Sequence, residues 1–116
     1  MPSVRLSDLE PLELIGGVNA RIASSENIML SHVEFDEGCL VPEHRHPNEQ
    51  CGIVLSGRIR FTIAGEEHVV EAGDFFLIPP NEVHSAVAID GPAVALDIFV
   101  PPRSDYLERQ NKAFGG

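Results

Sequence analysis

Short apolar runs separated by glycine and proline turns make up most of the chain. Between residues 58 and 63, polar and apolar positions alternate, which is typical of a strand with one buried face and one wet face. Runs rich in Val, Ile, Leu and Phe predict strands at 28–35, 51–55, 58–63, 68–70, 75–78, 83–89 and 94–100. Many short strands of this kind predict an all-β sandwich or barrel.

A length of 116 residues is enough for one domain, so we expect residues 1–116 to fold as a single unit. Its C-terminal tail, 104–116, is the one part in which we expect a helix, at 104–113 after Pro101-Pro102. We expect the barrel core to contain four phenylalanines, Phe35, Phe61, Phe75 and Phe76.

Charge and hydropathy exclude several kinds of partner. The chain has 8 Lys and Arg against 18 Asp and Glu, a net charge of −10, which disfavours nucleic acid and anionic lipid surfaces. No apolar run reaches the ~20 residues of a membrane span, and no signal-like segment begins the chain, so we expect a cytoplasmic protein. In that compartment, Cys39 and Cys51 are expected to be reduced thiols.

Three histidines and a glutamine have the spacing of metal ligands. On a strand, residues two apart point to the same face, so His44 and His46 can share one ion. A turn at Pro47-Asn48 can bring the Gln50 carbonyl back towards them, and His84 stands at the start of another strand. The sequence thus predicts one divalent transition metal per chain, with Zn, Ni, Mn, Fe and Cu all compatible with the ligands.

The spacing around these residues resembles the two motifs of the cupin family. Motif 1 spans 38–57 and motif 2 spans 73–84, with a 15-residue gap between them. Their positions are Gly38, His44, His46, Gln50 and Gly57, then Gly73, Pro79, Asn81 and His84. The resemblance implies a single-domain cupin, a small double-stranded β-barrel of the jelly-roll type.

Two positions depart from the general cupin pattern. Gln50 stands where a ligand glutamate is usual, and an all-neutral ligand set leaves the ion its full double charge, which favours an anionic oxygen ligand. Asn81 replaces a glycine, and asparagine tolerates the left-handed backbone that a turn there requires.

A narrower resemblance is to the small cupins of pectin and alginate breakdown that linearise unsaturated uronates. It rests on the segments 44–50, 78–85, 95–99 and 101–107, with Glu66. In that group a Gln completes a three-His metal site, and an Asp and a Phe lie beside it. The resemblance implies a metal held by His44, His46, Gln50 and His84, with Asp97 and Phe99 as neighbours.

Asp97 also stands out on its own, because it interrupts the apolar strand 94–100. An unpartnered buried carboxylate costs several kcal/mol, so we expect Asp97 to face a polar cavity as the catalytic acid or base. An edge-strand position facing water remains the alternative. Arg103 is a candidate for binding a substrate carboxylate, with a surface salt bridge as its alternative, and Phe99 would shape the pocket. We interpret His32 as a core or interface histidine and His68 as exposed.

Together these features predict a metal-dependent enzyme that converts a small anionic unsaturated uronate to its linear keto form. Two other interpretations stay open: a cupin dioxygenase, and a non-catalytic module that binds a sugar or small acid through the metal. The resemblance also implies a homodimer, because exposed N-terminal strands of such barrels often pair with a partner. The sequence itself shows only apolar stretches, such as 12–15, that need a cover.

Overall fold

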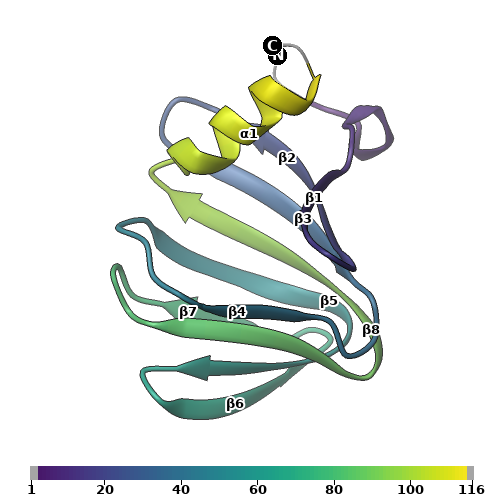
Figure 1. The fold of residues 1–116 in the computed structure, drawn as a ribbon, viewed down its shortest axis with the longest axis vertical. Coiled ribbons are helices and arrows are strands. Elements are labelled where there is room, and N and C mark those ends of the chain that lie inside the picture. The colour runs from purple at the N-terminus through teal and green to yellow at the C-terminus, as the bar shows by residue number, and fades with distance from the viewer. Residues whose placement is uncertain (1–2, 115–116) are drawn as a thin grey trace.

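The structure, a computed structural model, describes residues 3–114 and consists of one antiparallel eight-stranded sheet with a C-terminal helix (Figure 1). The elements are η1 (Leu6–Asp8), β1 (Leu12–Ile15), β2 (Val18–Ser24), β3 (Met29–Phe35), β4 (Leu40–His44), β5 (Glu49–Ile63), β6 (Glu66–Glu71), β7 (Phe75–Ile78), β8 (His84–Val100) and α1 (Ser104–Phe114). None of the helices in this described part is long and apolar enough to cross a membrane.

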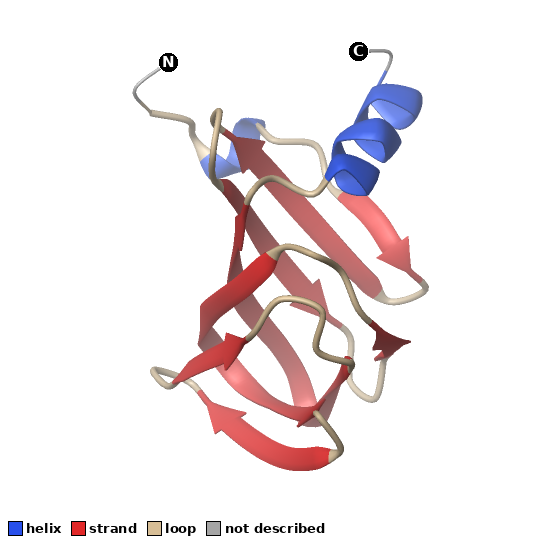
Figure 2. Ribbon diagram, turned by 90° about the vertical axis from the view of Figure 1, so that its left-hand side faces the viewer, coloured by secondary structure: helices blue, strands red, loops and turns tan. Residues whose placement is uncertain are grey.

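The strand order β1-β2-β3-β8-β5-β6, with β4 beside β8 and β7 beside β5, curls the sheet into two facing layers (Figure 2). Strands β5 and β8 belong to both layers. One half of β8 pairs with β3 and the other half with β4, while β5 pairs with β7 near its start and with β6 near its end. This is the all-β architecture expected of a cupin barrel.

Both long strands bend where a residue of positive φ interrupts the alternation of buried and exposed side chains. Gly57 (φ 76°) lies within the second register shift of β5, and Asp90 (φ 59°) and Gly91 (φ 130°) mark the bend of β8. A bulge of this kind adds one residue and moves the inward-facing positions from one parity to the other. Buried residues of β5 accordingly change from Gln50, Gly52 and Val54 to Ile59 and Phe61.

The core fills the space between the layers. Its largest fully buried side chains include Phe99, Met29, Ile59 and Ile78. The rings of Phe61 and Phe76 stack with their centroids 4.5 Å apart.

Several element predictions need correction. The predicted strands 51–55 and 58–63 are one strand, β5, and 83–89 and 94–100 are one strand, β8, because the bulges bend the chain without breaking its pairing. Strands β1, β2 and β4 were not predicted. Phe75 is not in the core: it is 76% exposed, since adjacent residues of β7 face opposite sides. The helix in the tail is confirmed as α1.

Candidate metal centre

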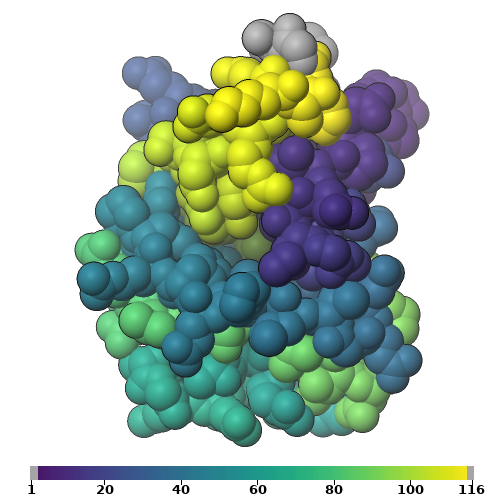
Figure 3. Space-filling view, in the orientation of Figure 1, coloured from purple at the N-terminus to yellow at the C-terminus, as the bar shows by residue number. Residues whose placement is uncertain are grey.

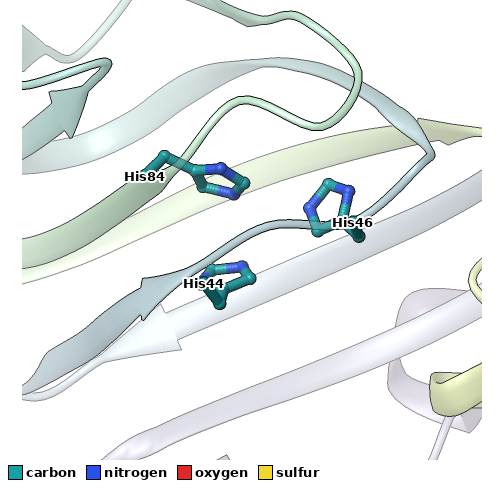
Figure 4. Close-up of side chains that lie close together, drawn as sticks. All are labelled: His44, His46 and His84. Atoms are coloured by element: carbon teal, nitrogen blue, oxygen red, sulfur yellow. The ribbon is translucent and has the colours of Figure 1, made fainter.

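Three histidine side chains, from β4, the loop after it and β8, lie close together (Figure 4). His44 ends β4, His46 lies in the loop that follows, and His84 begins β8, directly across the ladder from His44. One ring nitrogen from each lies within 4.8 Å of the other two. The turn before His84 is formed by Asn81, whose φ of 64° confirms that asparagine takes the left-handed conformation there.

Backbone carbonyls set the tautomer of all three rings. The Nδ1 atom of His44 lies 2.9 Å from the carbonyl oxygen of Pro42, that of His46 3.0 Å from Asn48 O, and that of His84 2.8 Å from Glu82 O. A carbonyl oxygen only accepts, so each Nδ1 carries the proton and each Nε2 presents a lone pair. This is the arrangement of metal-binding imidazoles, whose second nitrogen is held by a carbonyl or carboxylate.

Two features of the side-chain atoms in this cluster suit the binding of a cation. His84 Nε2 is buried and has no hydrogen-bond partner among the described residues. His46 Nε2 lies 3.1 Å from Gln50 Oε1. With the His46 proton on Nδ1, both atoms of that pair are acceptors. Two ligand atoms that each lie about 2.1 Å from one ion, at a right angle to each other, are separated by about 3 Å. The distance of 3.1 Å between His46 Nε2 and Gln50 Oε1 agrees with this value, so the residues present fit a divalent transition ion.

Burial keeps the imidazoles neutral and ready to bind a metal. Burial lowers the pKa of His84 to about 4, with the neighbouring His44 and His46 also disfavouring its charge. The pKa of His46 is lowered by burial and then by the charge of Arg103. In the metal-free chain both rings are therefore unprotonated at pH 7, which is the form that binds a metal.

Asp97 lines a small cavity that is also lined by His44 and His84; we call this cavity the chamber. This position excludes the alternative in which Asp97 sits on an edge strand and faces water. Asp97 lies on β8 opposite Gly52 and lines the chamber with Phe99. Burial raises the pKa of the Asp97 carboxyl to about 7, although the hydrogen bond from Gln50 and the charge of Arg103 both act to lower it. Because Gln50 Oε1 faces His46, its amide NH₂ is the group that donates to Asp97.

Phe99 and Arg103 complete the wall near Asp97. Phe99 is 1% exposed, and its ring meets His46 edge-on at 5.6 Å and Tyr106 at 5.7 Å. The Arg103 guanidinium is buried, lies 3.8 Å from the Tyr106 ring centroid, and donates two hydrogen bonds to Asp105 at 2.7 and 3.2 Å. The salt bridge considered for Arg103 exists: its guanidinium is buried, while the Asp105 side chain is 58% exposed at the surface.

Two residues of the site were missed by sequence reasoning. Tyr106, on the first turn of α1, lines the chamber, and burial raises the pKa of its hydroxyl to about 12. Asn48 is buried and donates from Nδ2 to the carbonyl oxygen of Pro101 at 2.7 Å, tying the His46 loop to the end of β8. The sequence feature that could have indicated Tyr106 is its position shortly after Pro101-Pro102, where the tail turns back over the barrel.

The remaining candidates lie away from the cluster. His68 is exposed, and His32 is half-buried on the outer face of β3 with an unpartnered Nδ1. Cys39 and Cys51 are half-buried and are not paired with each other.

Comparison with known proteins agrees with this geometry. The profile of the cupin domain family matches residues 31–99. The chain is a cupin. This cupin is 30% identical over 105 residues to the "Pectin degradation protein KdgF" of Dickeya dadantii (strain 3937), covering 88% of this chain and 96% of that protein. It is 34% identical over 77 residues to the "H2HPP isomerase" of Bacillus subtilis, which covers 66% of this chain but only 32% of that protein.

Solved structures give the same picture. KdgF from Halomonas sp. superposes with a TM-score of 0.80 at 28% identity, over 86% of this cupin and 93% of that chain. An RmlC-like cupin from Shewanella frigidimarina also has a TM-score of 0.80 at 28% identity, over 86% of this cupin and 90% of that chain.

Proposed function

We propose that this cupin is a metal-dependent enzyme that converts a small unsaturated uronate to its linear keto form. The observation that carries the proposal is the Asp97 carboxyl group beside the three-histidine cluster. Its raised pKa of about 7 lets it both accept and return a proton near neutral pH. The similarity to pectin degradation proteins supports the substrate class.

His44, His46 and His84 would hold the metal, with the Gln50 carbonyl as a fourth ligand. When bound, a divalent ion supplies Lewis acidity towards a substrate oxygen that gains negative charge. The His46 and Gln50 side chains are positioned by other residues of the chain, through Asn48 O and the Asp97 carboxyl group.

The chain's own part of the reaction is a proton transfer through Asp97. Its carboxylate takes the proton of the anomeric hydroxyl, the anomeric carbon becomes an aldehyde as its bond to the ring oxygen breaks, and that electron pair stays with the ring oxygen as an enolate. The protonated Asp97 then returns the proton to the far carbon of the enolate, which leaves a ketone. Atoms and charge balance without a further reactant, so the net change is an isomerisation.

The test compares the parent with Asp97→Asn, which keeps size and hydrogen-bonding capacity but removes the proton acceptor. We expect the rate of loss of ultraviolet absorbance of an unsaturated uronate to fall by ~10²–10⁴, the usual contribution of acid–base catalysis, with metal content unchanged. The matched control is Asp90→Asn, an exposed carboxylate paired with Arg58 at the bend of β8.

Equal rates in the parent and in Asp97→Asn would refute the role of Asp97. Absence of turnover in both, with uronate bound, would support the binding module. Oxygen uptake by the iron-loaded protein with a candidate substrate would support the dioxygenase.

We also propose that a second copy of the chain covers the outer face of the β2-β3-β8-β5-β7 layer. Side chains there form two registered rows across five strands, and Phe75 and Leu77 are 76% and 74% exposed. The rows are Ala23, Leu30, Ile98, Cys51, Leu77 and Arg21, His32, Leu96, Ile53, Phe75.

The rows contain no Asp or Glu, although the chain has 18. These two rows form a patch without carboxylates, where two chains of net charge −10 can meet with little repulsion, and a two-fold dimer places the same patch on both sides. Light scattering is expected to show a dimer for the parent and a monomer for Phe75→Ser/Leu77→Ser, with the exposed β6 substitution Val69→Ser as control. A monomeric parent, or a dimeric double variant, would refute this interface.

A further inference from the structure

The chamber at the metal cluster is too small for a sugar ring. Its volume is about 40 Å³, and its wall includes His44, His84, Asp97, Phe99 and Tyr106. Since one water occupies ~30 Å³ of liquid, the chamber has room for about one water molecule. Only the reacting edge of a substrate can enter it, and the rest of the substrate must bind further out.

A larger hollow lies directly outside the chamber. This vestibule has a volume of about 250 Å³, room for ~8 waters at that size. It shares part of its wall with the chamber: Leu14, Val41, His44, Arg103 and Tyr106. Figure 3 shows the hollow where the purple N-terminal strand, the blue segment of β4 and the yellow C-terminal segment meet.

The vestibule contains two arginines whose charges differ in availability. Arg103 is already paired with the Asp105 carboxylate through two hydrogen bonds. Arg109, on the exposed side of α1, takes part in none of the ion pairs found in residues 3–114. Its Nη2 donates to two backbone carbonyls of β1, Glu13 O at 2.6 Å and Leu14 O at 3.3 Å.

The Arg109 contacts hold the guanidinium in place and leave its charge uncompensated. Two carbonyl oxygens accept hydrogen bonds but carry no net charge, so the cation keeps its attraction for an anion. In a chain of net charge −10, an arginine that is outside these ion pairs, at the mouth of the site, favours the binding of an anionic ligand there.

We infer that the vestibule is an outer binding site for a sugar acid and that Arg109 binds the carboxylate of that acid there. The ring then lies against Tyr106 and the apolar side chains of Leu14 and Val41, with its other edge towards the metal cluster. The choice of a sugar acid as ligand rests on the proposed function. Arg109 is a specificity-determining residue for an anionic ligand and takes no part in the proton transfer.

The chain offers its own reporter for this site. It contains no tryptophan and one tyrosine, Tyr106, so its intrinsic emission comes from the wall of the vestibule. The experiment titrates the Zn²⁺-loaded protein with D-glucuronate and, separately, with the uncharged methyl ester of glucuronate. Tyr106 emission and isothermal titration calorimetry give the two dissociation constants at 20 and 200 mM salt.

We expect Arg109→Gln to raise the dissociation constant for glucuronate about 5- to 10-fold and to reduce its salt dependence, with the ester unaffected. Arg109→Lys is expected to retain most of the affinity, because it keeps the charge. Arg60→Gln is the matched control. It removes the same charge from the distant β5–β6 pair, where Arg60 faces Glu67, and is expected to behave as the parent.

Three results would overturn the inference: no glucuronate binding by the parent, no change in Arg109→Gln, or equal weakening for the acid and the ester. The last would mean that Arg109 only anchors α1 to β1. Because the titration involves no turnover, a failure of uronate linearisation leaves its outcome readable. Intact turnover with a failed titration would reject the outer site alone.

Discussion

Replacing the Asp97 carboxyl group with an amide is expected to stabilise the metal-free protein at pH 8 and to change it little at pH 4. Burial raises the pKa of Asp97 to about 7 in the folded chain, from 3.8 in the absence of the fold. Between these values the folded chain binds more protons than the unfolded chain, so stability falls as the pH rises through that window. Asp97→Asn has no proton to lose and escapes this cost.

The size of the effect follows from the two pKa values. They differ by about 3, and each unit corresponds to ~1.36 kcal/mol, so the full difference is about 4 kcal/mol. A small domain has a total stability of roughly 5–15 kcal/mol, so the change is large enough to measure directly. The variant would thus be more stable than the parent and far less active.

Urea unfolding of EDTA-dialysed protein, followed by far-ultraviolet circular dichroism at each pH from 4 to 8, measures this difference. Asp8→Asn, an exposed carboxylate at η1, is the control and is expected to shift the unfolding free energy by less than ~0.5 kcal/mol. A difference between Asp97→Asn and the parent that is the same at every pH, or a variant less stable at pH 8, would refute the reasoning.

Three further changes test other parts of the molecule. His44→Ala/His84→Ala is expected to lose the bound ion, as measured by elemental analysis, and retention of the parent's metal content would refute the ligand assignment. Gln50→Glu is expected to keep or tighten metal binding and to raise the KM for an anionic substrate about tenfold, because one negative charge is added at the ion; an unchanged KM would contradict this. Gly52→Ala is expected to lower the free energy of unfolding by ~3 kcal/mol or more in urea titrations, because the added Cβ would overlap the carbonyl oxygen of Leu96 and the Phe76 ring on β7. Stability equal to that of the parent would show that the strands can move apart there.

The barrel could be predicted from its turn residues and apolar runs, but the continuity of its long strands could not. Gly57 and Asp90-Gly91 are residues typical of turns. At each of these places the buried positions of the strand change from even-numbered to odd-numbered residues. A parity change is equally compatible with a turn and with a bulge inside one strand. The ladder between β5 and β8, which distinguishes the two, pairs residues that are 21 to 51 positions apart in the sequence.

For the site, spacing brought His44, His46 and His84 to attention, and the structure places their side chains together. The alternation of β8 placed Asp97 on the face of Phe99, and both line the chamber. Tyr106 could not be found in this way, because its position depends on how α1 packs over the barrel mouth. That packing rests on long-range contacts, among them Arg109 with β1 and Gln110 with Ile22 O.

The backbone partners of the three imidazoles have a consequence for how this protein can change over generations. Each Nδ1 proton is held by a main-chain carbonyl, at Pro42, Asn48 and Glu82. A point mutation alters side chains and leaves carbonyl groups in place, so the tautomers persist through sequence drift as long as the loops keep their shape. Single nucleotide changes at position 50 or 97 can therefore alter the charge of the chamber while these backbone contacts of the histidines stay in place.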